Sequence, residues 1–480
     1  MKTFLGVDLG TSSIKLTLTD IKGNIINEVS ETYPLFQDGV FSEQNPSDWW
    51  NTFEIAFDKV LENQNRKELE ALSFSGQMHG LVILDENDNV IRPCILWNDS
   101  RSEKEVNYLN NEIGRNVLND LTGNIAYAGF TAPKILWVKN NEPENFKRIK
   151  KIMLPKDYLV YRLTGNFVSD YSDASGTLLL DCKNKCWNNK IAVICGVIAS
   201  QLPELHESFD VVGTINNEFK TKHDLGDAKV VMGAGDNAAA SIGMGVINQG
   251  EINISLGTSG TIFIPTDSFV KTKNNELHSF ASVTGKWHLM GCILTAASAR
   301  KWWLENIIND NDYNLDEELI NNANTDGLYF LPYLSGERSP HNDTNIRGAF
   351  IGLNHSTTRG EMSKAILEGV SFALKDCLEI AIKEGFSFNK ATLCGGGVKS
   401  EEWCQIIADV FGLDIYVGDG SPSLGAALIA IKGSKNIPFE DLVKNLKYNK
   451  VYKPIKENVE SYKQKYSVFK TLYPALKNIK

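Results

Sequence analysis

Apolar and polar residues are arranged along the first 30 positions in a way that predicts three strands. Residues 4–9 are mostly apolar, residues 14–19 alternate, and residues 25–29 begin and end with apolar side chains. Two turn sequences separate these segments, Gly10-Thr11-Ser12-Ser13 and Lys22-Gly23-Asn24. Glycine and small polar residues between apolar runs are typical of turns. We therefore expect the chain to open with an antiparallel meander.

A similar pattern returns about half a chain later. Leu9-Gly10-Thr11-Ser12 recurs as Leu256-Gly257-Thr258-Ser259, and Thr19-Asp20 recurs as Thr266-Asp267, both at an offset of 247 residues. Two matches in one register indicate an internal duplication. Two unrelated hairpins with similar turns are the alternative. We expect two domains, residues 1–246 and 247–480, that share a core topology.

Longer periodic segments complete both halves. Residues 46–61 carry apolar side chains at helical spacing after Asn45-Pro46, a start typical of helices. The other segments expected to be strands are 69–74, 81–84, 230–232, 250–256, 260–264, 286–292, 392–394 and 414–417, and the other expected helices are 238–242, 294–308, 359–384, 401–411 and 424–431. The lysine-rich tail after Tyr448 is expected to be a solvated helix. Strands alternating with helices predict an α/β protein.

The stretch Gly233-Ala234-Gly235-Asp236-Asn237 lies between a predicted strand and a predicted helix. Asp236 at such a place could simply cap the helix. Two features favour a catalytic carboxylate instead. Flanking glycines let a ligand approach the backbone, and α/β sheets bind ligands at the carboxyl ends of their strands.

Composition restricts the partners. The net charge of −10 should repel a polyanion, so nucleic acid is not an expected partner. No stretch reaches the roughly 20 apolar residues of a membrane span, and Asp8 interrupts the first apolar run, which argues against a signal peptide. The eight cysteines have no zinc-binding spacing. They indicate free, mostly buried thiols in a cytoplasmic protein.

The two Gly-Thr-Ser turns are candidate phosphate sites, because glycine permits close approach while backbone N–H and hydroxyl groups donate to phosphate. Thr11 belongs to the first turn, and Gly257 and Thr258 to the second. A plain hairpin turn is the alternative for each. Asp8 precedes the first turn in an apolar strand and suits Mg²⁺ beside phosphates. Ser255 takes its place in the second half, so only the first half is expected to hold metal.

Three further segments carry candidate binding residues. Gly395 and Gly396, between a predicted strand and helix, could let a base or ribose lie on the backbone, or could form a packing turn. Met78 and His79 lie in a loop bounded by glycines and could bind a polyhydroxy substrate, although His79 could also be structural. Trp97 could wall a sugar or belong to the core.

The candidate phosphate, metal and sugar residues together suggest a role for Asp236. Phosphoryl transfer to a hydroxyl needs a metal on the phosphates and a carboxylate near the hydroxyl proton. Asp236 is the candidate for that carboxylate. Asn237 beside it is a candidate substrate contact, or a cap for the helix.

These motifs resemble those of the FGGY carbohydrate kinases, most closely the xylulokinase group, along essentially the whole chain. Gln77-Met78-His79 and Trp97-Asn98-Asp99 are the segments that distinguish this group from glycerol and gluconate kinases. The full set of similar segments is 6–12, 76–80, 95–99, 129–134, 154–158, 172–177, 235–239, 255–260 and 330–338. Ser339 is a departure, since the family has threonine there, but it keeps a hydroxyl.

The resemblance implies two ribonuclease-H-like domains of the actin and hexokinase superfamily with Mg²⁺ and ATP in the cleft between them. It implies phosphorylation of D-xylulose to D-xylulose 5-phosphate. By the same resemblance Asp236 is the catalytic base and Met78, His79 and Asn237 bind the sugar. Asp8 is then the metal-linked carboxylate, and the nucleotide residues are Thr11, Gly257, Thr258, Gly395 and Gly396.

Two alternatives stay open. One is a kinase for another pentulose or polyol, such as ribulose or L-xylulose. The other is a nucleotide-driven binding protein of the actin or heat-shock type, which would not need Gln77 to His79. The expected partner is a small ketopentose. A homodimer is the assembly that the chain could form.

Overall fold

The computed structural model describes residues 1–418 and 420–479 and contains two large sheets. The first sheet has six strands in the order β14-β15-β6-β1-β2-β3. Their bounds are β1 Thr3–Leu9, β2 Ser13–Thr19, β3 Ile25–Thr32, β6 Leu69–Gly76, β14 Val211–Thr214 and β15 Lys229–Gly235. The antiparallel meander expected from the opening residues is confirmed by the pairing of β1 with β2 and of β2 with β3.

The second sheet has seven strands in the order β18-β19-β17-β16-β22-β23-β24. Their bounds are β16 Glu251–Leu256, β17 Gly260–Thr266, β18 His278–Ala281, β19 Trp287–Ile293, β22 Lys390–Cys394, β23 Ile415–Val417 and β24 Lys450–Tyr452. Strands β18 and β24 were not predicted. Both are short edge strands, so they carry little periodic signal of their own.

Five strands of each sheet share one topology. The orders β3-β2-β1-β6-β15 and β19-β17-β16-β22-β23 correspond strand by strand. In each set the first three strands are antiparallel neighbours, and the last two run parallel to the central one. The α/β fold with a duplicated core, expected from the offset of the two turns, is therefore confirmed. The cut between residues 246 and 247 stays a proposal.

Helices cover the sheets and supply the cores. Helix α1 (Pro46–Val60) starts where predicted, with the Asn45 side chain accepting from Ser47 N–H. The helix predicted at 294–308 begins later, as α11 (Ala297–Trp302), and continues as a wider turn over Trp303–Ile308. Helices α13 (Arg359–Lys383) and α14 (Glu401–Phe411) match the predicted ranges closely.

The C-terminal helix differs from its prediction. Helix α17 (Lys456–Leu476) is not simply solvated, because Tyr466 and Phe469 are buried in the core of the second half. Three of its lysines are exposed, Lys465 is partly buried against Glu368 and Thr325, and one aromatic stripe packs inward. The helix is therefore amphipathic, which its high lysine content did not indicate.

The remaining elements are shorter or connect the sheets. The helices are α2 Glu103–Asn107, α3 Arg115–Thr122, α4 Thr131–Asn141, α5 Pro143–Arg148, α6 Pro155–Thr164, α7 Tyr171–Ala174, α8 Asn189–Cys195, α9 Asn217–Lys222, α10 Asp236–Gly243, α12 Tyr313–Asn321, α15 Pro422–Lys435 and α16 Phe439–Val443. The strands are β4 Phe36–Asp38, β5 Phe41–Gln44, β7 Val82–Leu84, β8 Cys94–Ile95, β9 Lys151–Met153, β10 Val168–Asp170, β11 Leu180–Asp181, β12 Cys186–Trp187, β13 Glu204–His206, β20 Tyr329–Leu331 and β21 Ala349–Ile351. None of the helices in the described ranges has the length and hydropathy needed to cross a membrane. All eight cysteines are free and six of them are buried.

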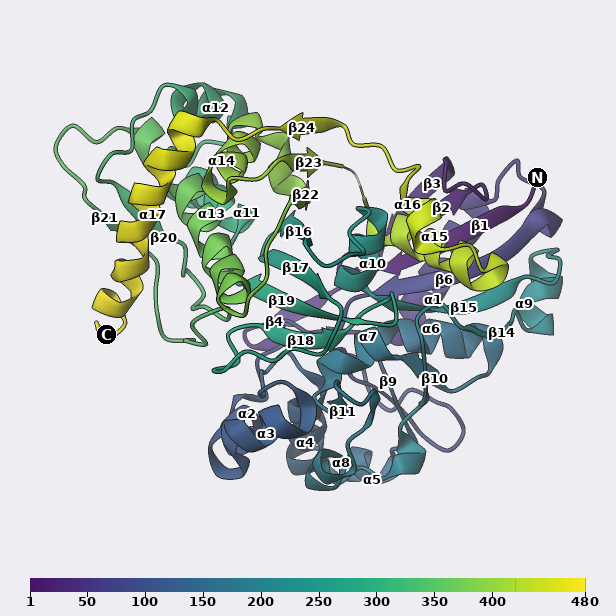
Figure 1. Ribbon diagram of the computed structural model, residues 1–480. Coiled ribbons are helices and arrows are strands. Elements are labelled where there is room, and N and C mark those ends of the chain that lie inside the picture. Colours follow the sequence, from purple (N-terminus) through teal and green to yellow (C-terminus); the bar gives the residue numbers. More distant parts are fainter. Residues whose placement is uncertain (419, 480) are drawn as a thin grey trace.

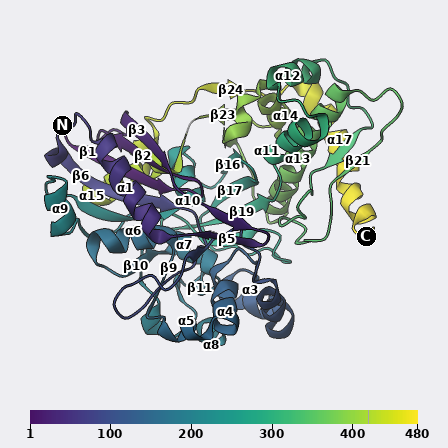
Figure 2. The same cartoon turned by 180° about the vertical axis from the view of Figure 1, so that it is seen from behind.

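The two halves meet at helices α10 and α15. Figure 1 shows α15, from the end of the chain, beside β1 and β2 of the first sheet, while α17 lies on the opposite lobe. Figure 2 shows the same separation of the two lobes from behind. Where α15 crosses α10, the backbone of Gly425 lies against the carbonyl of Ala239, and a methyl group there would overlap it. The junction is therefore built from small residues in backbone contact.

Candidate active site

A sharp corner joins β15 to α10 and presents Asp236. Gly233 adopts φ +82° at an irregularity in the pairing of β15 with β6, and a side chain there would overlap the carbonyl of Phe74. Glycine is needed for that conformation. Gly235 is then the N-cap and Asp236 the first helical residue, so Asp236 does not cap the helix.

The carboxylate of Asp236 is held on one side only. Oδ1 accepts from the backbone N–H of Asn237 at 2.7 Å and from its side-chain amide at 2.9 Å. Within the described residues, Oδ2 accepts no hydrogen bond. Burial raises the pKa of Asp236 to about 7, and the Asp8 carboxylate contributes to the rise. A half-oriented carboxylate that titrates near neutral pH is suited to accept a proton.

Asn237 links the corner to the other half of the molecule. Its side-chain oxygen accepts from the hydroxyl of Thr261 in β17, at 3.2 Å. Its amide nitrogen is already given to Asp236. The structure therefore places Asn237 as the group that orients the carboxylate, and a sugar contact by Asn237 stays a proposal.

Asp8 lies in β1 at the floor of the same region. The hydroxyl of Ser75 donates to its Oδ1 at 2.9 Å. Burial raises the pKa of Asp8 to about 6, against the lowering effects of Ser75 and Lys15. No group of three or more His, Cys, Asp or Glu side chains in the described part of the chain could hold a metal by itself. One or two carboxylates, completed by phosphates and water, is however the donor set that Mg²⁺ takes in phosphoryl-transfer sites, so the residues present fit that ion.

The loop after β6 positions His79. This residue adopts φ +70°, which is uncommon for histidine. Its Nδ1 lies 2.7 Å from the carbonyl oxygen of Gly176, so Nδ1 carries the proton and donates. The ring stacks on Phe130 at 4.7 Å, and burial lowers the pKa of His79 to about 3. The neutral ring therefore leaves Nε2 as an acceptor for a substrate hydroxyl.

Two side chains from α4 fix the loop from below, and neither was predicted individually. Lys134 donates to the carbonyls of His79 at 2.9 Å and Gly129 at 2.6 Å, and Thr131 donates to His79 at 3.1 Å. Burial lowers the pKa of Lys134 to about 7. In the sequence, Lys134 could have been recognised only as a lysine among the buried positions of a helix, and that requires knowing which face of α4 is buried.

Met78 connects this loop to the corner. Its Cγ and Sδ lie 3.0 Å from where a Cβ on Gly235 would be, and its methyl group lies 3.2 Å from the corresponding point on Gly176. Met78 therefore packs against the residue that precedes Asp236, and the roles expected of Met78, His79 and Asp236 stay predictions.

The candidate nucleotide residues of the second half lie close together, whereas Thr11 belongs to the first sheet. Gly395 adopts φ +95° and packs so closely on the backbone of Leu256 that it brings the β22 loop against the turn that contains Gly257 and Thr258. The carbonyl of Thr258 accepts from Ala296 N–H at 2.9 Å and from the Ser298 hydroxyl at 2.6 Å. Thr258 itself is exposed, and within the described residues its side-chain hydroxyl makes no hydrogen bond. The turn containing Thr11 belongs to the first sheet, and its hydroxyl accepts from the indole of Trp97 at 2.9 Å.

A buried charged cluster lies behind the corner. Lys156 is fully buried and bonds Asp157 at 2.6 Å and Asp170 at 2.8 Å, with Asp173 at 3.5 Å. Asp170 accepts from the Ser172 hydroxyl, which in turn accepts from Gly235 N–H at 3.2 Å. The chain of contacts ends one residue before Asp236, so the cluster supports the corner from within. Its role was not predicted.

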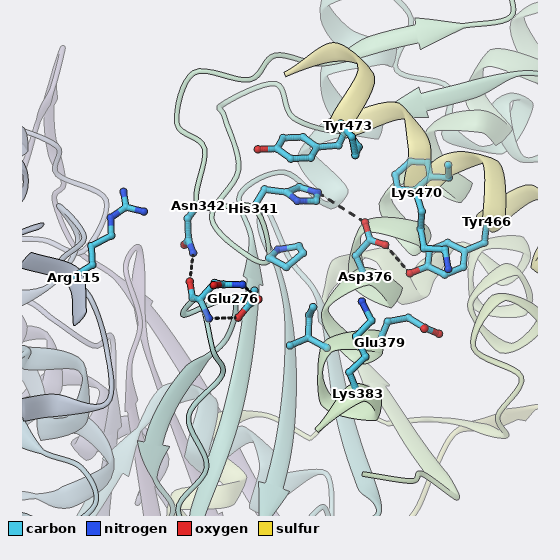
Figure 3. Close-up of a pocket in the computed structure, with 15 residues that line it drawn as sticks. Arg115, Glu276, His341, Asn342, Asp376, Glu379, Lys383, Tyr466, Lys470 and Tyr473 are labelled. Atoms are coloured by element: carbon cyan, nitrogen blue, oxygen red, sulfur yellow. Dashed lines mark hydrogen bonds and ion pairs between the residues drawn. The ribbon is translucent and has the colours of Figure 1, made fainter. Parts of the chain in front are cut away.

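Besides a cavity of about 410 Å³ between β2, β3 and α15, two further cavities lie at the boundary of the halves. One, of about 610 Å³, is lined from the first half by Trp97, Tyr127 and Gly129 and from the second by Leu294 and Arg338. The other, of about 520 Å³, lies between α3, α13 and α17. Figure 3 shows its lining, with Asp376 bonded to Tyr466 and approached by His341. None of the predicted site residues lines this second cavity.

Two family models match most of the chain. The N-terminal domain of the "FGGY family of carbohydrate kinases" matches residues 3–243, and the C-terminal domain matches residues 252–433. Among curated proteins, the xylulose kinase of Escherichia coli (strain K12) is 36% identical over 98% of this chain and 99% of its own length.

Solved structures show the same similarity. A crystal structure of a "xyloylose kinase" from Brucella ovis has a TM-score of 0.95 and 36% identity and covers 100% of both chains. A gluconate kinase from Lactobacillus acidophilus has the same TM-score at 27% identity, covering 100% of this chain and 99% of its own. The fold therefore does not by itself determine the sugar.

Proposed function

Because the chain belongs to the FGGY family of carbohydrate kinases, we propose that it transfers the terminal phosphoryl group of ATP to D-xylulose, giving ADP and D-xylulose 5-phosphate. Full-length similarity to proteins that carry the name xylulose kinase supports this substrate. The observation that carries the proposal is Oδ2 of Asp236, which accepts no hydrogen bond within the described residues and follows Gly235, the residue that packs on Met78.

The reaction follows from the groups on that wall. The terminal hydroxyl of the sugar donates to Oδ2 of Asp236, which takes its proton as the oxygen attacks the γ-phosphorus. The new O–P bond forms as the bond to the ADP oxygen breaks, and ADP leaves with that electron pair. His79 accepts from a sugar hydroxyl through Nε2, and Asn237 holds the carboxylate in orientation.

The nucleotide is proposed to lie between the two sheets. Thr11 and Thr258 offer hydroxyls, the two turns offer backbone N–H groups, and Gly395 and Gly396 offer a surface without side chains. Asp8 would hold Mg²⁺ together with phosphate oxygens, and the ion would supply neutralisation of the phosphate charge. Because the pKa values of Asp8 and Asp236 are both raised, a cation near them would restore both carboxylates to their charged forms.

An ADP-release assay across ketopentoses and polyols tests the proposal. D-Xylulose should give the highest kcat/KM of the panel, which should include D-ribulose, L-xylulose, xylitol, D-arabinitol and glycerol. A preference for another pentulose would change the substrate but keep the chemistry. Slow ADP release that no sugar stimulates would contradict the kinase assignment. The family and the proposed reaction are also consistent with a cytoplasmic protein.

A further inference from the structure

Arg338 is a half-buried arginine that faces the cavity of about 610 Å³ without an acidic partner. It comes from the second half, on the loop after β20. Its guanidinium carbon lies 5.3 Å from the ring centre of Tyr127, and one of its terminal nitrogens lies 3.5 Å from where a Cβ on Gly129 would be. Tyr127 and Gly129 belong to the first half, so Arg338 reaches across the cleft.

Three carboxylates also line the cavity, those of Asp99, Glu103 and Glu337. The Oε2 of Glu337 is buried without a hydrogen-bond partner among the described residues. Glu337 turns its Oε1 to the backbone N–H groups of Leu294 at 3.0 Å and Arg338 at 2.7 Å, and burial raises its pKa to about 8. Asp99, which also lines the cavity, is bound by Arg101 at 2.6 Å. Within the described residues, no carboxylate pairs with the Arg338 guanidinium. Its donors are therefore available to an oxygen-rich ligand.

The cavity that Arg338 faces is also lined by Asp99, Glu103, Arg115 and Glu337, whereas the nearby imidazoles carry no charge. The two nearest imidazoles, His79 and His278, are kept neutral, with pKa values lowered first by burial and then by nearby cations, including Arg338. Lys134 is occupied by the carbonyls of His79 and Gly129. Two arginines line this cavity without a protein acceptor among the described residues, the exposed Arg115 and the half-buried Arg338. Arg338 is the one that lies over Tyr127, and Tyr127 packs on Phe130, on which the ring of His79 stacks.

The order of residues along the wall gives the ligand a direction. Asp236 follows Gly235, which packs on Met78, and the ring of the next residue, His79, stacks on Phe130. Phe130 packs on Tyr127, and the guanidinium of Arg338 lies over the ring of Tyr127. Asp236 therefore stands at the end where the hydroxyl reacts, and Arg338 stands toward the opposite end of the substrate.

A 2-ketopentose has a hydroxyl at one end that can react and a carbonyl near the other end that can be bound. In solution the hydroxyl on C5 can add to the carbonyl on C2 and close a furanose ring. In that ring neither a free C5 hydroxyl nor a ketone exists, so only the open chain can be phosphorylated on O5. A site that binds the C2 carbonyl while the C5 hydroxyl meets the base selects the reactive form.

We propose that Arg338 donates to the C2 carbonyl of the open-chain ketopentose and is the residue that distinguishes a ketose from a polyol. This inference rests on the proposed function. The guanidinium fork offers two parallel donors to carbonyl and hydroxyl oxygens, which a lysine would not reproduce. The polyol that replaces C=O with CH–OH keeps the C5 hydroxyl but lacks the carbonyl acceptor.

The test compares D-xylulose with xylitol and D-arabinitol, its two reduction products. Wild-type and Arg338→Gln enzymes are assayed for kcat/KM on D-xylulose, and the two pentitols are titrated as competitive inhibitors. Arg338→Gln should lose roughly 10- to 100-fold in kcat/KM for D-xylulose, the size of one hydrogen bond to a charged group. The inhibition constants of the pentitols should change less than about 3-fold. KM for ATP should stay unchanged.

Controls separate the proposal from loop damage and from the proposed function. Arg347→Gln removes a guanidinium on the same loop that bonds backbone carbonyls of Thr344 and Ile346, and it should retain the preference for ketose. Equal losses for D-xylulose and the pentitols in Arg338→Gln, or no loss for either, would overturn the role of Arg338. A wild-type enzyme inactive on every ketopentose would instead refute the proposed function.

Discussion

The indole N–H of Trp97 donates to the hydroxyl of Thr11 at 2.9 Å. Trp97 lines the cavity beside the sugar loop, whereas Thr11 belongs to the first candidate phosphate turn. The sequence left two interpretations of Trp97 open, a sugar wall and a core residue. The bond adds a third role, because it joins the candidate sugar wall to the first candidate phosphate turn directly.

Trp97→Phe keeps a ring in the wall but removes the donor. Because Thr11 then loses its fixed orientation, kcat/KM should fall by roughly 3- to 10-fold with either substrate varied, about 1 kcal/mol. Steady-state kinetics at fixed and varied ATP measure this. Trp287→Phe is the matched control, since its N–H bonds the Cys182 carbonyl away from this pocket. A change confined to the sugar parameters would show that the bond does not couple the sites.

Asp236→Asn should lower kcat by about 10² to 10⁴ while binding of ATP persists, because the amide keeps the shape but accepts no proton. Single-turnover kinetics and calorimetric titration with a non-hydrolysable nucleotide give the two readouts. Asp441→Asn, on exposed α16, should leave both unchanged. Turnover near the wild-type value would remove Asp236 as the base.

The pH dependence of kcat/KM should show an acidic limb near pH 7. Asp236 must be deprotonated to act, and its pKa in the free protein is about 7. Below that pH the fraction of active base falls, so kcat/KM should drop about tenfold for each unit. His79, with a pKa of about 3, cannot produce this limb. A profile that is flat from pH 5.5 to 8 would contradict the assignment.

Gly396→Ala should separate folding from nucleotide binding. A Cβ at Gly396 would contact no protein atom within 4 Å, so the melting temperature should stay within about 1 °C of wild type. If the nucleotide lies on this backbone, the methyl group should raise KM for ATP by roughly 5-fold or more and leave KM for the sugar unchanged. Gly395→Ala, at φ +95° against Leu256, should instead destabilise the fold. An unchanged KM for ATP in Gly396→Ala would place the nucleotide elsewhere.

Ser172→Ala should weaken catalysis without touching either substrate. The Gly235 N–H loses its acceptor, and Asp170 loses a donor. An unsatisfied buried group costs about 1–3 kcal/mol, so kcat should fall by roughly 5- to 50-fold, with a shift of the acidic limb. Ser172→Thr restores the hydroxyl and should recover most of the rate. An altered melting temperature with unchanged kcat and pH profile would mean that the cluster is structural only.

Local signals predicted the parts of the site that depend on short stretches of chain. The β15–α10 corner was visible because an apolar run, glycines and small residues follow one another. The duplication was visible because two turns recur in one register. Helix α1 was visible from its cap, its proline and its aromatic stripe.

Contacts between distant segments were not predictable in this way. Lys134 reaches the His79 carbonyl across 55 residues, and Ser172 reaches Gly235 across 63. Arg338 lies over Tyr127 from the other half of the molecule. A lysine, a serine and an arginine have many partners available in a chain of this length, and only the packing of the sheets selects one.

The crossing of α10 and α15 has a consequence for the timing of the reaction. Small residues in backbone contact allow one helix to roll on the other with little repacking, so the crossing is suited to act as a pivot. Asp236 is the first residue of one of these two helices. A swing that brings the lobes together would thus turn the carboxylate at the same moment, and proton acceptance would wait for both substrates to be enclosed. Such an interlock would also protect ATP from water in the absence of sugar.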